Sequence, residues 1–258
     1  EGVRELILVA QDPTAYGEDW GRPGAICELL DRLQEIDGIR WIRILYAYPE
    51  RISDAFIAAM VRNTKVVPYL DLPIQHCDDA VLKAMNRRGG RKEIEDAIAR
   101  LRAAIPGITL RTTLIAGFPG ETEEQYAELC DFVKTVRFDR LGCFAYSAEE
   151  NTVAAKMPNQ IDEETKQRRA DHIMELQAEV SAEREGEKVG HTYECICDGV
   201  DDETGMYLLR TKADCPEIDG NVLTPVDTPL ETGAFYKVTI TDSDTYDLYG
   251  YAEERLED

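Results

Sequence analysis

The stretch that most constrains the fold is residues 109–120, TLRTTLIAGFPG. Its apolar run contains β-branched residues and breaks at Gly117 and Gly120, which predicts a strand followed by a tight glycine turn. Thr122 and Gln125 then have the spacing of a capping box, which predicts the start of a helix. In an α/β sheet or barrel such a turn lies at the carboxyl end of a strand, where a flat ligand can approach the backbone closely. An ordinary strand-to-helix connection is the alternative interpretation.

The same alternation of strand and helix recurs through residues 3–150. Mostly apolar runs lie at 6–10, 42–47, 69–74, 110–116 and 141–146. Segments with apolar residues at helical spacing lie between them, at 25–36, 53–62, 79–85, 92–104 and 122–136. Continuous apolar runs are typical of parallel strands that are covered on both faces. We therefore expect an α/β fold, either a parallel barrel or a doubly wound sheet.

The character of the sequence changes after this region. Residues 162–188 are highly charged, and a stripe of Ile173, Leu176 and Val180 predicts a helix that packs one side against the barrel. Five short runs then lie at 192–197, 206–211, 222–226, 234–241 and 246–251, separated by turn residues. They predict a small β-barrel of the oligonucleotide-binding type. The expected division is 1–187 for the first barrel with its bridging helix and 188–258 for the small barrel.

The chain is strongly acidic, with 29 Lys and Arg against 51 Asp and Glu and a formal net charge of −22. Residues 187–258 alone contain five Lys and Arg against 18 Asp and Glu, a net charge of −13. Affinity for nucleic acid comes largely from Lys and Arg that displace counterions, so direct nucleic-acid binding is not expected. A basic protein partner fits better, and solubility alone is the other explanation of this charge.

Length and cysteine content narrow the class of protein further. At 258 residues the chain is long enough for two domains, and it contains neither a run that could span a membrane nor a secretory signal. Its seven cysteines form no C-x-x-C pair or other metal-ligand spacing, which predicts a cytoplasmic protein without a metal site of its own. The chain opens directly into a strand without an initiator Met, so we expect a fragment of a longer polypeptide.

Polar residues follow three further apolar runs. These segments are 10–17 (AQDPTAYG), 73–79 (PIQHCDD) with 82–89 (LKAMNRRG), and 144–152 (FAYSAEENT). Because parallel strands present ligand groups at their carboxyl ends, we expect these segments to meet at one edge of the sheet. Taken separately, each is a weak signal.

Together, in this order and spacing, these segments closely resemble the radical S-adenosylmethionine methylthiotransferases over nearly the whole chain. The runs LRTTLIAGFPGETEE, DRLGCFAYS, SAEREGEKVG, CPEIDG and YDLYG are similar to the RimO-type branch, which methylthiolates the β-carbon of an aspartate in the small-subunit ribosomal protein uS12. The resemblance implies a partial (β/α) TIM-like barrel, incomplete at its amino end, followed by a five-stranded, OB-like TRAM domain. In that branch the TRAM domain holds the protein substrate, which here would be a basic ribosomal protein or the ribosomal subunit.

The resemblance also implies a site for S-adenosylmethionine. Gln11 and Asp12 would hold the methionine amino end of the cofactor, because an amide oxygen or a carboxylate accepts from an ammonium. The other implied contacts are Gln75 with His76 at the ribose, Arg111 and Thr113 at the cofactor carboxylate, Ile115 and Gly117 at the adenine, and Tyr146 with Ser147 closing the pocket. An interior ion pair for Arg111 and a core position for Tyr146 are the alternatives.

One departure from the family is decisive. The resemblance implies two 4Fe–4S clusters in the intact protein, one of them on the three cysteines of a C-x-x-x-C-x-x-C loop after the first barrel strand. This sequence contains no such loop. We therefore expect that the chain begins at the second barrel strand, lacks the domain that binds the second cluster, and cannot start the reaction alone. In the intact enzyme, the reduced cluster would cleave the cofactor to a radical that removes hydrogen from the aspartate β-carbon.

Three other functions stay open at this point. One is a MiaB-like tRNA adenosine methylthiotransferase, the sister branch of the same family. The second is a catalytically silent adaptor that binds the ribosome and has lost its cluster. The third is a conventional barrel aldolase or hydrolase, against which stands the absence of a recognisable Lys or metal-ligand set at the strand ends of the sequence.

Overall fold

The computed structural model describes residues 2–227 and 229–257, and five parallel strands form its larger sheet. The strands are β1 (Glu5–Leu8), β2 (Trp41–Ile44), β3 (Val66–Asp71), β4 (Thr109–Ala116) and β5 (Arg140–Ala145). They pair in chain order, β1-β2-β3-β4-β5, and β1 and β5 form the two edges of an open sheet. This arrangement confirms the prediction of a parallel α/β fold that is only part of a barrel.

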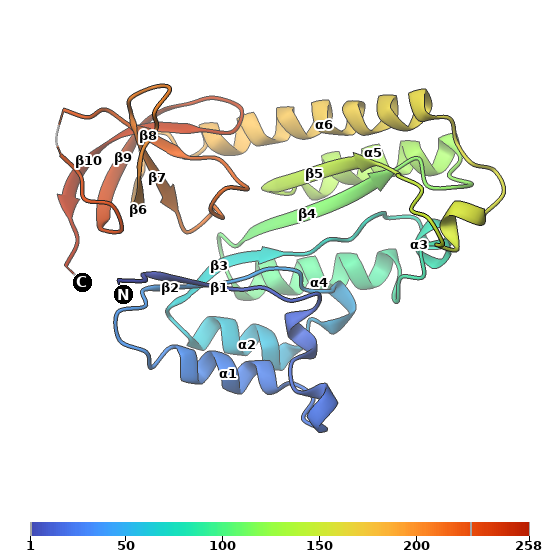
Figure 1. Cartoon of the computed structure of the whole chain (residues 1–258), viewed down its shortest axis with the longest axis horizontal. Helices are drawn as coiled ribbons and strands as arrows, with labels where there is room; N and C mark the ends of the chain where they lie inside the picture. The colour runs from blue at the N-terminus through green and yellow to red at the C-terminus, as the bar shows by residue number, and fades with distance from the viewer. Residues whose placement is uncertain (1, 228, 258) are drawn as a thin grey trace.

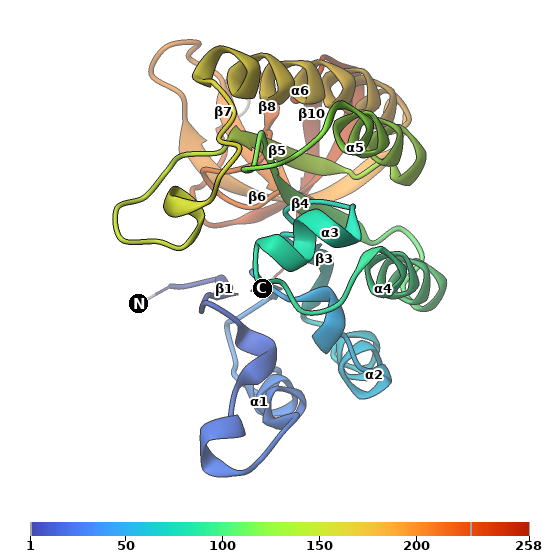
Figure 2. The ribbon, with the colours of Figure 1, turned by 90° about the vertical axis from the view of Figure 1, so that its right-hand side faces the viewer.

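Five helices connect the strands and cover the outer face of the curved sheet (Figures 1 and 2). They are α1 (Ala25–Leu33), α2 (Asp54–Arg62), α3 (Asp79–Ala84), α4 (Arg91–Ala104) and α5 (Glu123–Val136). Short 3-10 turns lie at η1 (Pro13–Ala15), η2 (Glu18–Trp20), η3 (Pro49–Arg51) and η4 (Ala154–Lys156). The predicted capping box starts α5: the Thr122 N–H donates to Gln125 Oε1 at 2.9 Å, and the Gln125 N–H donates to Thr122 Oγ1 at 3.3 Å.

The two faces of the sheet have different surroundings. On β4, Leu110 and Leu114 point to the outer face and lie in the main hydrophobic core between the sheet and its helices. Arg111, Thr113 and Ile115 alternate with them and lie half-buried on the inner face. Because no helix of the strand–helix units covers this inner face, another part of the chain has to cover it or it stays open to solvent.

The second unit is a closed β-barrel with the strand order β10-β8-β7-β6-β9. Its strands are β6 (Thr192–Val200), β7 (Tyr207–Thr211), β8 (Val222–Thr224), β9 (Phe235–Ser243) and β10 (Leu248–Arg255). The number of strands and the closure were predicted, but the last strand begins later than residue 246. Asp244 Oδ1 accepts from the N–H groups of Tyr246 and Asp247, each at 2.9 Å, so these residues form a turn before β10.

A long helix, α6 (Glu163–Gly186), joins the two units and packs against β5 and α5. Its predicted stripe of Ile173, Leu176 and Val180 is buried. Figure 1 shows it running from the carboxyl ends of the strands back to the small barrel. None of the described helices, α6 included, is both long and apolar enough to cross a membrane.

The small barrel covers the amino-terminal half of the inner face of the sheet. Trp41, only 1% exposed, packs against Phe235 of the small barrel with a ring-centroid distance of 4.9 Å and an interplanar angle of 74°. The Trp41 indole Nε1 donates to Glu194 Oε1 at 2.9 Å. Trp41 therefore contributes both apolar area and a hydrogen bond across this interface.

Buried charges complete the interface, and each is paired. Arg43 Nε lies 2.8 Å from Glu5 Oε1, and Arg210 of the small barrel lies 2.8 Å from the other carboxylate oxygen of Glu5. At β5, Arg140 pairs with Asp214 of the small barrel at 2.6 Å. Because every such ion needs its partner in place, these pairs fix the orientation of the small barrel on the sheet.

The carboxyl-terminal half of the inner face stays open. Val9, which follows β1, is 61% exposed, and Phe144 on β5 is 62% exposed. Exposed apolar side chains on the concave side of a parallel sheet are typical of a surface that contacts a ligand or a partner. The open half of the inner face is therefore the candidate binding surface.

We expect the substitution Trp41→Ala to lower the free energy of unfolding by about 3–5 kcal/mol, because it removes a fully buried aromatic side chain from the interface. The chain offers a matched control, since its other tryptophan, Trp20, is 61% exposed. Trp20→Ala should cost less than about 1 kcal/mol. Urea unfolding followed by far-UV circular dichroism measures both, and equal losses would show that Trp41 does not join the two units.

Candidate functional site

A cavity of about 540 Å³ lies at the carboxyl ends of the first four strands, on the open half of the inner face. Its lining residues are Val9, Ala10, Gln11, Tyr46, Tyr48, Pro73, Gln75, Arg87 and Thr113. Three of the residues singled out in the sequence, Gln11, Gln75 and Thr113, therefore share one cavity. They come from the ends of β1 and β3 and from the middle of β4, as expected for a ligand site in a parallel sheet.

The backbone of Gln75 joins two strands beyond the end of β3. Its N–H donates to the Thr113 carbonyl at 2.9 Å, and the Ile115 N–H donates to the Gln75 carbonyl at 2.8 Å. Gln75 has a φ of +69°, and Tyr46, also in the cavity wall, has a φ of +64°. Non-glycine residues in this region cost about 1–2 kcal/mol each and cluster at functional sites. Two such residues in one cavity wall therefore support a functional role for this cavity.

Ile115 and Tyr146 form an apolar wall beside the cavity. Tyr146 is buried, and its ring meets that of Phe118 edge-on with a centroid distance of 5.2 Å. Ile115 and Val81 belong to the same cluster. The Tyr146 hydroxyl is buried and has no hydrogen-bond partner among the described residues. Tyr146 is thus a core residue that keeps one unsatisfied polar atom, while Ser147, on the loop that follows, is exposed.

The glycine turn after β4 is filled by the protein itself. Gly117 has a φ of +76°, and a Cβ at this position would lie 2.5 Å from Cγ of Lys166, in the first turn of α6. The Gly117 N–H donates to Glu121 Oε2 at 3.0 Å. The buried Lys166 side chain therefore occupies the side of Gly117 where a Cβ would project, and the approach of a flat ligand to this turn stays a prediction.

His76 does not reach the cavity. It is fully buried, its Nδ1 accepts from the Asp78 N–H at 3.0 Å, and its Nε2 lies 3.5 Å from Glu121 Oε2. Glu121 is also buried and pairs with Arg169 Nη1 at 2.7 Å. The left-handed turn at Gln75 directs the two neighbouring side chains apart, so Gln75 lines the cavity and His76 supports the glycine turn from behind.

The carboxylate of Asp12 is likewise bound by other residues of the chain. Its carboxylate accepts from the Thr14 N–H at 3.0 Å as the N-cap of η1, and it pairs with Arg51 Nε at 2.8 Å. Asp followed by Pro at the first helical position is a common helix start, which explains the geometry. Asp12 lines a neighbouring pocket and not the cavity of Gln11, so the prediction that both residues hold one ligand group is not met.

Arg111 lies in the covered half of the inner face, away from the cavity. Its Nη1 pairs with Asp71 Oδ1 at 3.0 Å, and its Nε lies 3.6 Å from Asp219 of the small barrel. Burial raises the pKa of Asp71, an effect that the Arg111 guanidinium partly offsets. The interior ion pair is therefore the correct interpretation of Arg111, because the small barrel brings a carboxylate to it.

The sequence reasoning missed three residues of the cavity wall. Tyr46 and Tyr48 follow the second strand, and Arg87 follows α3. The Arg87 guanidinium stacks over the Tyr48 ring at 4.5 Å from its centroid and donates to the Pro73 carbonyl. Tyr46 and Tyr48 could have been found from their position in the sequence. They follow the second apolar run, which ends at the same edge of the sheet as the first and the third.

The cysteines of the chain are poorly placed to hold a metal. Among residues 2–227 and 229–257, no group of three or more His, Cys, Asp or Glu side chains could hold a metal ion. Burial raises the pKa of Cys77 and of Cys143 to about 12, which disfavours the thiolate form that metals bind. The described cysteines therefore belong to no cluster of metal-ligand side chains.

Comparison with known proteins gives two family matches. A family model described as the radical SAM superfamily matches residues 1–133, and one described as the TRAM domain matches residues 189–252. Curated proteins named ribosomal protein uS12 methylthiotransferase RimO, from Lachnoclostridium phytofermentans and Pelobacter propionicus, are each 46% identical to the chain over 98% of its length. The match covers 57% and 56% of those proteins, so the chain spans about half the length of the curated relatives it matches.

Solved structures share the fold at low sequence identity. Coproporphyrinogen III oxidase (HemN) from Escherichia coli has a TM-score of 0.56 and 19% identity, over 70% of this chain and 41% of its own. Archaeal Elp3 from Methanocaldococcus infernus has a TM-score of 0.50 and 16% identity, over 67% of this chain and 44% of its own. At these identities the likeness shows the fold alone.

The glycine turn can be tested with two substitutions of the same kind. Gly117→Ala adds a Cβ to a left-handed residue and forces it against Lys166, whereas Gly120→Ala adds one to a left-handed residue with nothing within 4 Å. The strained φ alone should cost about 1–2 kcal/mol in both. We expect Gly117→Ala to lose about 1–3 kcal/mol more, because the turn and α6 must separate. Chemical denaturation measures the difference, and equal losses would contradict the packing against Lys166.

Proposed function

Because the chain belongs to the radical SAM superfamily, we propose that it forms the cofactor-binding barrel and the TRAM domain of a methylthiotransferase that modifies an aspartate of ribosomal protein uS12. The observation that carries the proposal is the 45–47% identity, over 96–99% of the chain, to proteins bearing that name. The chain spans 56–57% of their length, so the reaction is proposed for a longer protein that contains it. Such a protein would meet its ribosomal substrate in the cytoplasm.

The cavity at the carboxyl ends of the strands suits S-adenosylmethionine in size and chemistry. Its volume of about 540 Å³ lies within the range of small-molecule sites, and it combines aromatic walls with few polar groups. The side-chain amides of Gln11 and Gln75 can each donate and accept, which suits the amino acid end and the ribose of the cofactor. S-adenosylmethionine bound with an iron–sulfur cluster supplies a radical that activates an unreactive C–H bond. The chain's own residues bind and orient the cofactor.

The proposed set of cofactor contacts differs from the one that the resemblance implies. Gln11, Gln75 and Thr113 are kept because they line the cavity, and Ile115 with Tyr146 is kept as the adjoining apolar wall. Ser147 remains a prediction. Tyr46, Tyr48 and Arg87 are added as further wall residues. Asp12, His76 and Arg111 are removed because each is held by other partners of the chain, and Gly117 is assigned to shaping the turn.

The iron–sulfur clusters do not fit the residues of this chain. The sequence contains no C-x-x-x-C-x-x-C loop, and the described cysteines are scattered. We therefore place the ligands of both clusters in polypeptide outside these 258 residues. No step of the reaction is assigned to a cysteine of this chain.

The protein substrate is proposed to be basic and to contact the TRAM domain. The net charge of −13 within residues 187–258 supports this, because a surface with this excess of carboxylates repels phosphate and attracts Lys and Arg. For this proposal we keep the division of the chain into a barrel with its bridging helix, 1–187, and a TRAM domain, 188–258.

The test of the function uses the full-length protein, reconstituted anaerobically with its clusters and incubated with S-adenosylmethionine, a sulfur source and small ribosomal subunits. We expect mass spectrometry of uS12 to show a methylthio group on one aspartate. Total tRNA, incubated in parallel, should remain without a methylthio group on adenosine. An unmodified uS12 together with methylthiolated tRNA would assign the chain to the tRNA-modifying branch, and no modification of either would favour a silent adaptor.

The cofactor site can be tested separately. Gln11→Ala should weaken the binding of S-adenosylmethionine to the reconstituted protein by about tenfold, because it removes one side-chain hydrogen-bonding group from an exposed cavity wall. Gln167→Ala is the matched control, since Gln167 is an exposed glutamine of α6 that bonds only to Asp171 among the described residues. Isothermal titration calorimetry gives both affinities. Equal affinity of Gln11→Ala and the parent protein would exclude Gln11 from the site.

A further inference from the structure

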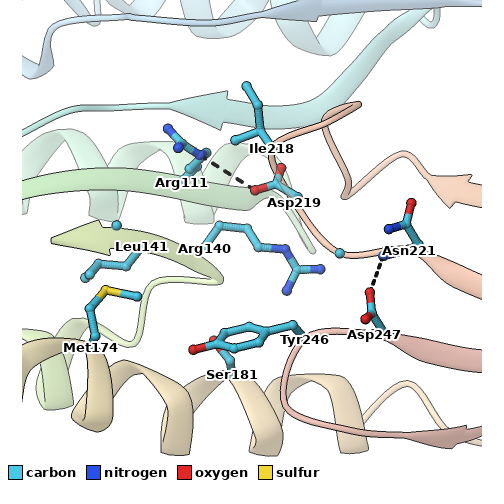
Figure 3. Close-up of a pocket in the computed structure, with 12 residues that line it drawn as sticks. Arg111, Arg140, Leu141, Met174, Ser181, Ile218, Asp219, Asn221, Tyr246 and Asp247 are labelled. Atoms are coloured by element: carbon cyan, nitrogen blue, oxygen red, sulfur yellow. Dashed lines mark hydrogen bonds and ion pairs between the residues drawn. The ribbon is translucent and has the colours of Figure 1, made fainter. Parts of the chain in front are cut away.

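A second cavity, of about 420 Å³, lies where β5, α6 and two loops of the small barrel meet. Figure 3 shows Arg111 and Arg140 entering it from the sheet and Asp219, Tyr246 and Asp247 entering it from the small barrel. None of these residues belongs to the proposed cofactor site. The cavity therefore needs an explanation of its own.

The two cavities lie along the same surface of the sheet. On the inner face, Arg111 pairs in register with Arg140, Thr113 with Gly142, and Ile115 with Phe144. Gly142 lines the second cavity and Thr113 lines the first. Arg111 lines the second cavity, and Ile115 belongs to the apolar wall beside the first. The distance along β4 between these two residues is about 13 Å, which an extended peptide of about four residues spans. A polypeptide lying on this surface can thus reach both cavities at once.

The charges that line the second cavity are two guanidinium groups, Arg111 and Arg140, and two carboxylates, Asp219 and Asp247. Arg140 pairs with Glu185 at 2.5 Å and with Asp214 at 2.6 Å, and Glu185 also pairs with Lys188 at 2.9 Å, so the charge of Arg140 is already compensated. Arg111 is shared in the same way between Asp71 and Asp219. Asp247 accepts from the Asn221 N–H at 2.7 Å and forms no ion pair within the described part of the chain. A further cation would therefore find an unmatched carboxylate here.

Other groups of the cavity also suit a bound peptide. Arg140 is only 7% exposed, yet its Nε has no hydrogen-bond partner among the described residues. Buried donors are normally paired, and a backbone carbonyl supplies an acceptor without adding a charge. Tyr246 and Ile218 are exposed at the rim, where they offer apolar contact, and an aromatic ring attracts a cation.

We propose that the second cavity binds a Lys or Arg side chain of the protein substrate, about four residues along an extended segment from the aspartate that is modified. Asp247 faces the cationic group, the Tyr246 ring covers its alkyl stem, and Arg140 Nε donates to a backbone carbonyl of the same segment. This inference rests on the proposed function and specifies the sequence that such a site selects. The small barrel then binds a specific side chain of the substrate beside the reaction site, in addition to attracting the substrate by net charge.

The test measures the binding of short fluorescent peptides to the full-length, cluster-loaded protein by anisotropy. Each peptide has a single Asp and a Lys about four residues before or after it. Asp247→Asn should weaken binding by about tenfold, because it removes the charge and keeps the oxygen that accepts from Asn221. Peptides with Gln in place of Lys should bind both proteins equally. An unchanged far-UV circular dichroism spectrum and thermal midpoint show that the variant is folded.

Asp202→Asn is the matched control, because Asp202 is an exposed carboxylate of the same small barrel that does not line the cavity. It should change peptide affinity by less than about twofold. Charge reversal gives a second check: Asp247→Lys should bind a peptide with Glu in place of Lys better than the parent protein does. Equal losses in the Asp202 and Asp247 variants would overturn the proposal in favour of general charge attraction.

Two parallel measurements separate this inference from the proposed function. If the parent enzyme modifies uS12 and Asp247→Asn does not weaken the Lys peptide, only the inference about the cavity falls. If uS12 stays unmodified while the Lys peptide binds in an Asp247-dependent way, the proposed function falls and the cation site stands. Tighter binding of a single-stranded RNA to Asp247→Lys, together with no preference for Lys peptides, would identify the surface as an RNA site and overturn the proposal.

Discussion

The structure depends on how the inner face of an open parallel sheet is covered. Helices pack against the outer face, but a sheet of five strands that does not close leaves its concave side without a core of its own. The small barrel covers half of that side with paired charges and with an apolar cluster that includes Trp41, Tyr69 and Phe235. Removing one partner of a buried ion pair costs about 3–5 kcal/mol, so the small barrel is held in one orientation. The open half is therefore a defined surface with a fixed boundary.

Both cavities follow from this boundary. The cavity of Gln11 and Gln75 lies on the open side, where the strand ends turn away from the sheet. The cavity of Arg140 and Asp247 lies on the boundary itself, where the small barrel, α6 and β5 meet. Since β4 contributes Thr113 to the first cavity and Arg111 to the second, a ligand bound in one is a neighbour of a ligand bound in the other. The arrangement suits an enzyme that must hold a cofactor and a protein segment side by side.

Local sequence patterns predicted the elements well, because strands and helices here follow their hydrophobic periods. The capping box at Thr122 and the stripe of α6 are examples, and each depends on residues close in the chain. Alternation along β4 also placed Arg111 and Thr113 on one face. It could not tell which half of that face the small barrel would cover, because the carboxylate that holds Arg111 comes from residue 219.

The other errors at the site have the same origin, since each depends on a contact or a turn that periodicity does not encode. The turn at Gly117 was predicted, but its contact with Lys166 was not, because Lys166 comes from a helix far along the chain. The side chain of His76 lies away from that of Gln75, and its Nε2 lies 3.5 Å from Glu121, a residue 45 positions further along the chain. Asp12 was assigned to a ligand although the Pro that follows it makes a helix cap at least as good an interpretation. The fold was therefore predicted more accurately than the side-chain contacts, because those contacts depend on residues that are distant in the sequence.

The helix α6 contacts both ends of the molecule, with Lys166 against the glycine turn and Glu185 against Arg140 at the boundary with the small barrel. Its 24 residues form a rod of about 36 Å. A tilt of about 5° at one end of such a rod displaces the other by about 3 Å, roughly the length of one hydrogen bond. The direction of this one helix therefore sets both the glycine turn and the boundary with the small barrel.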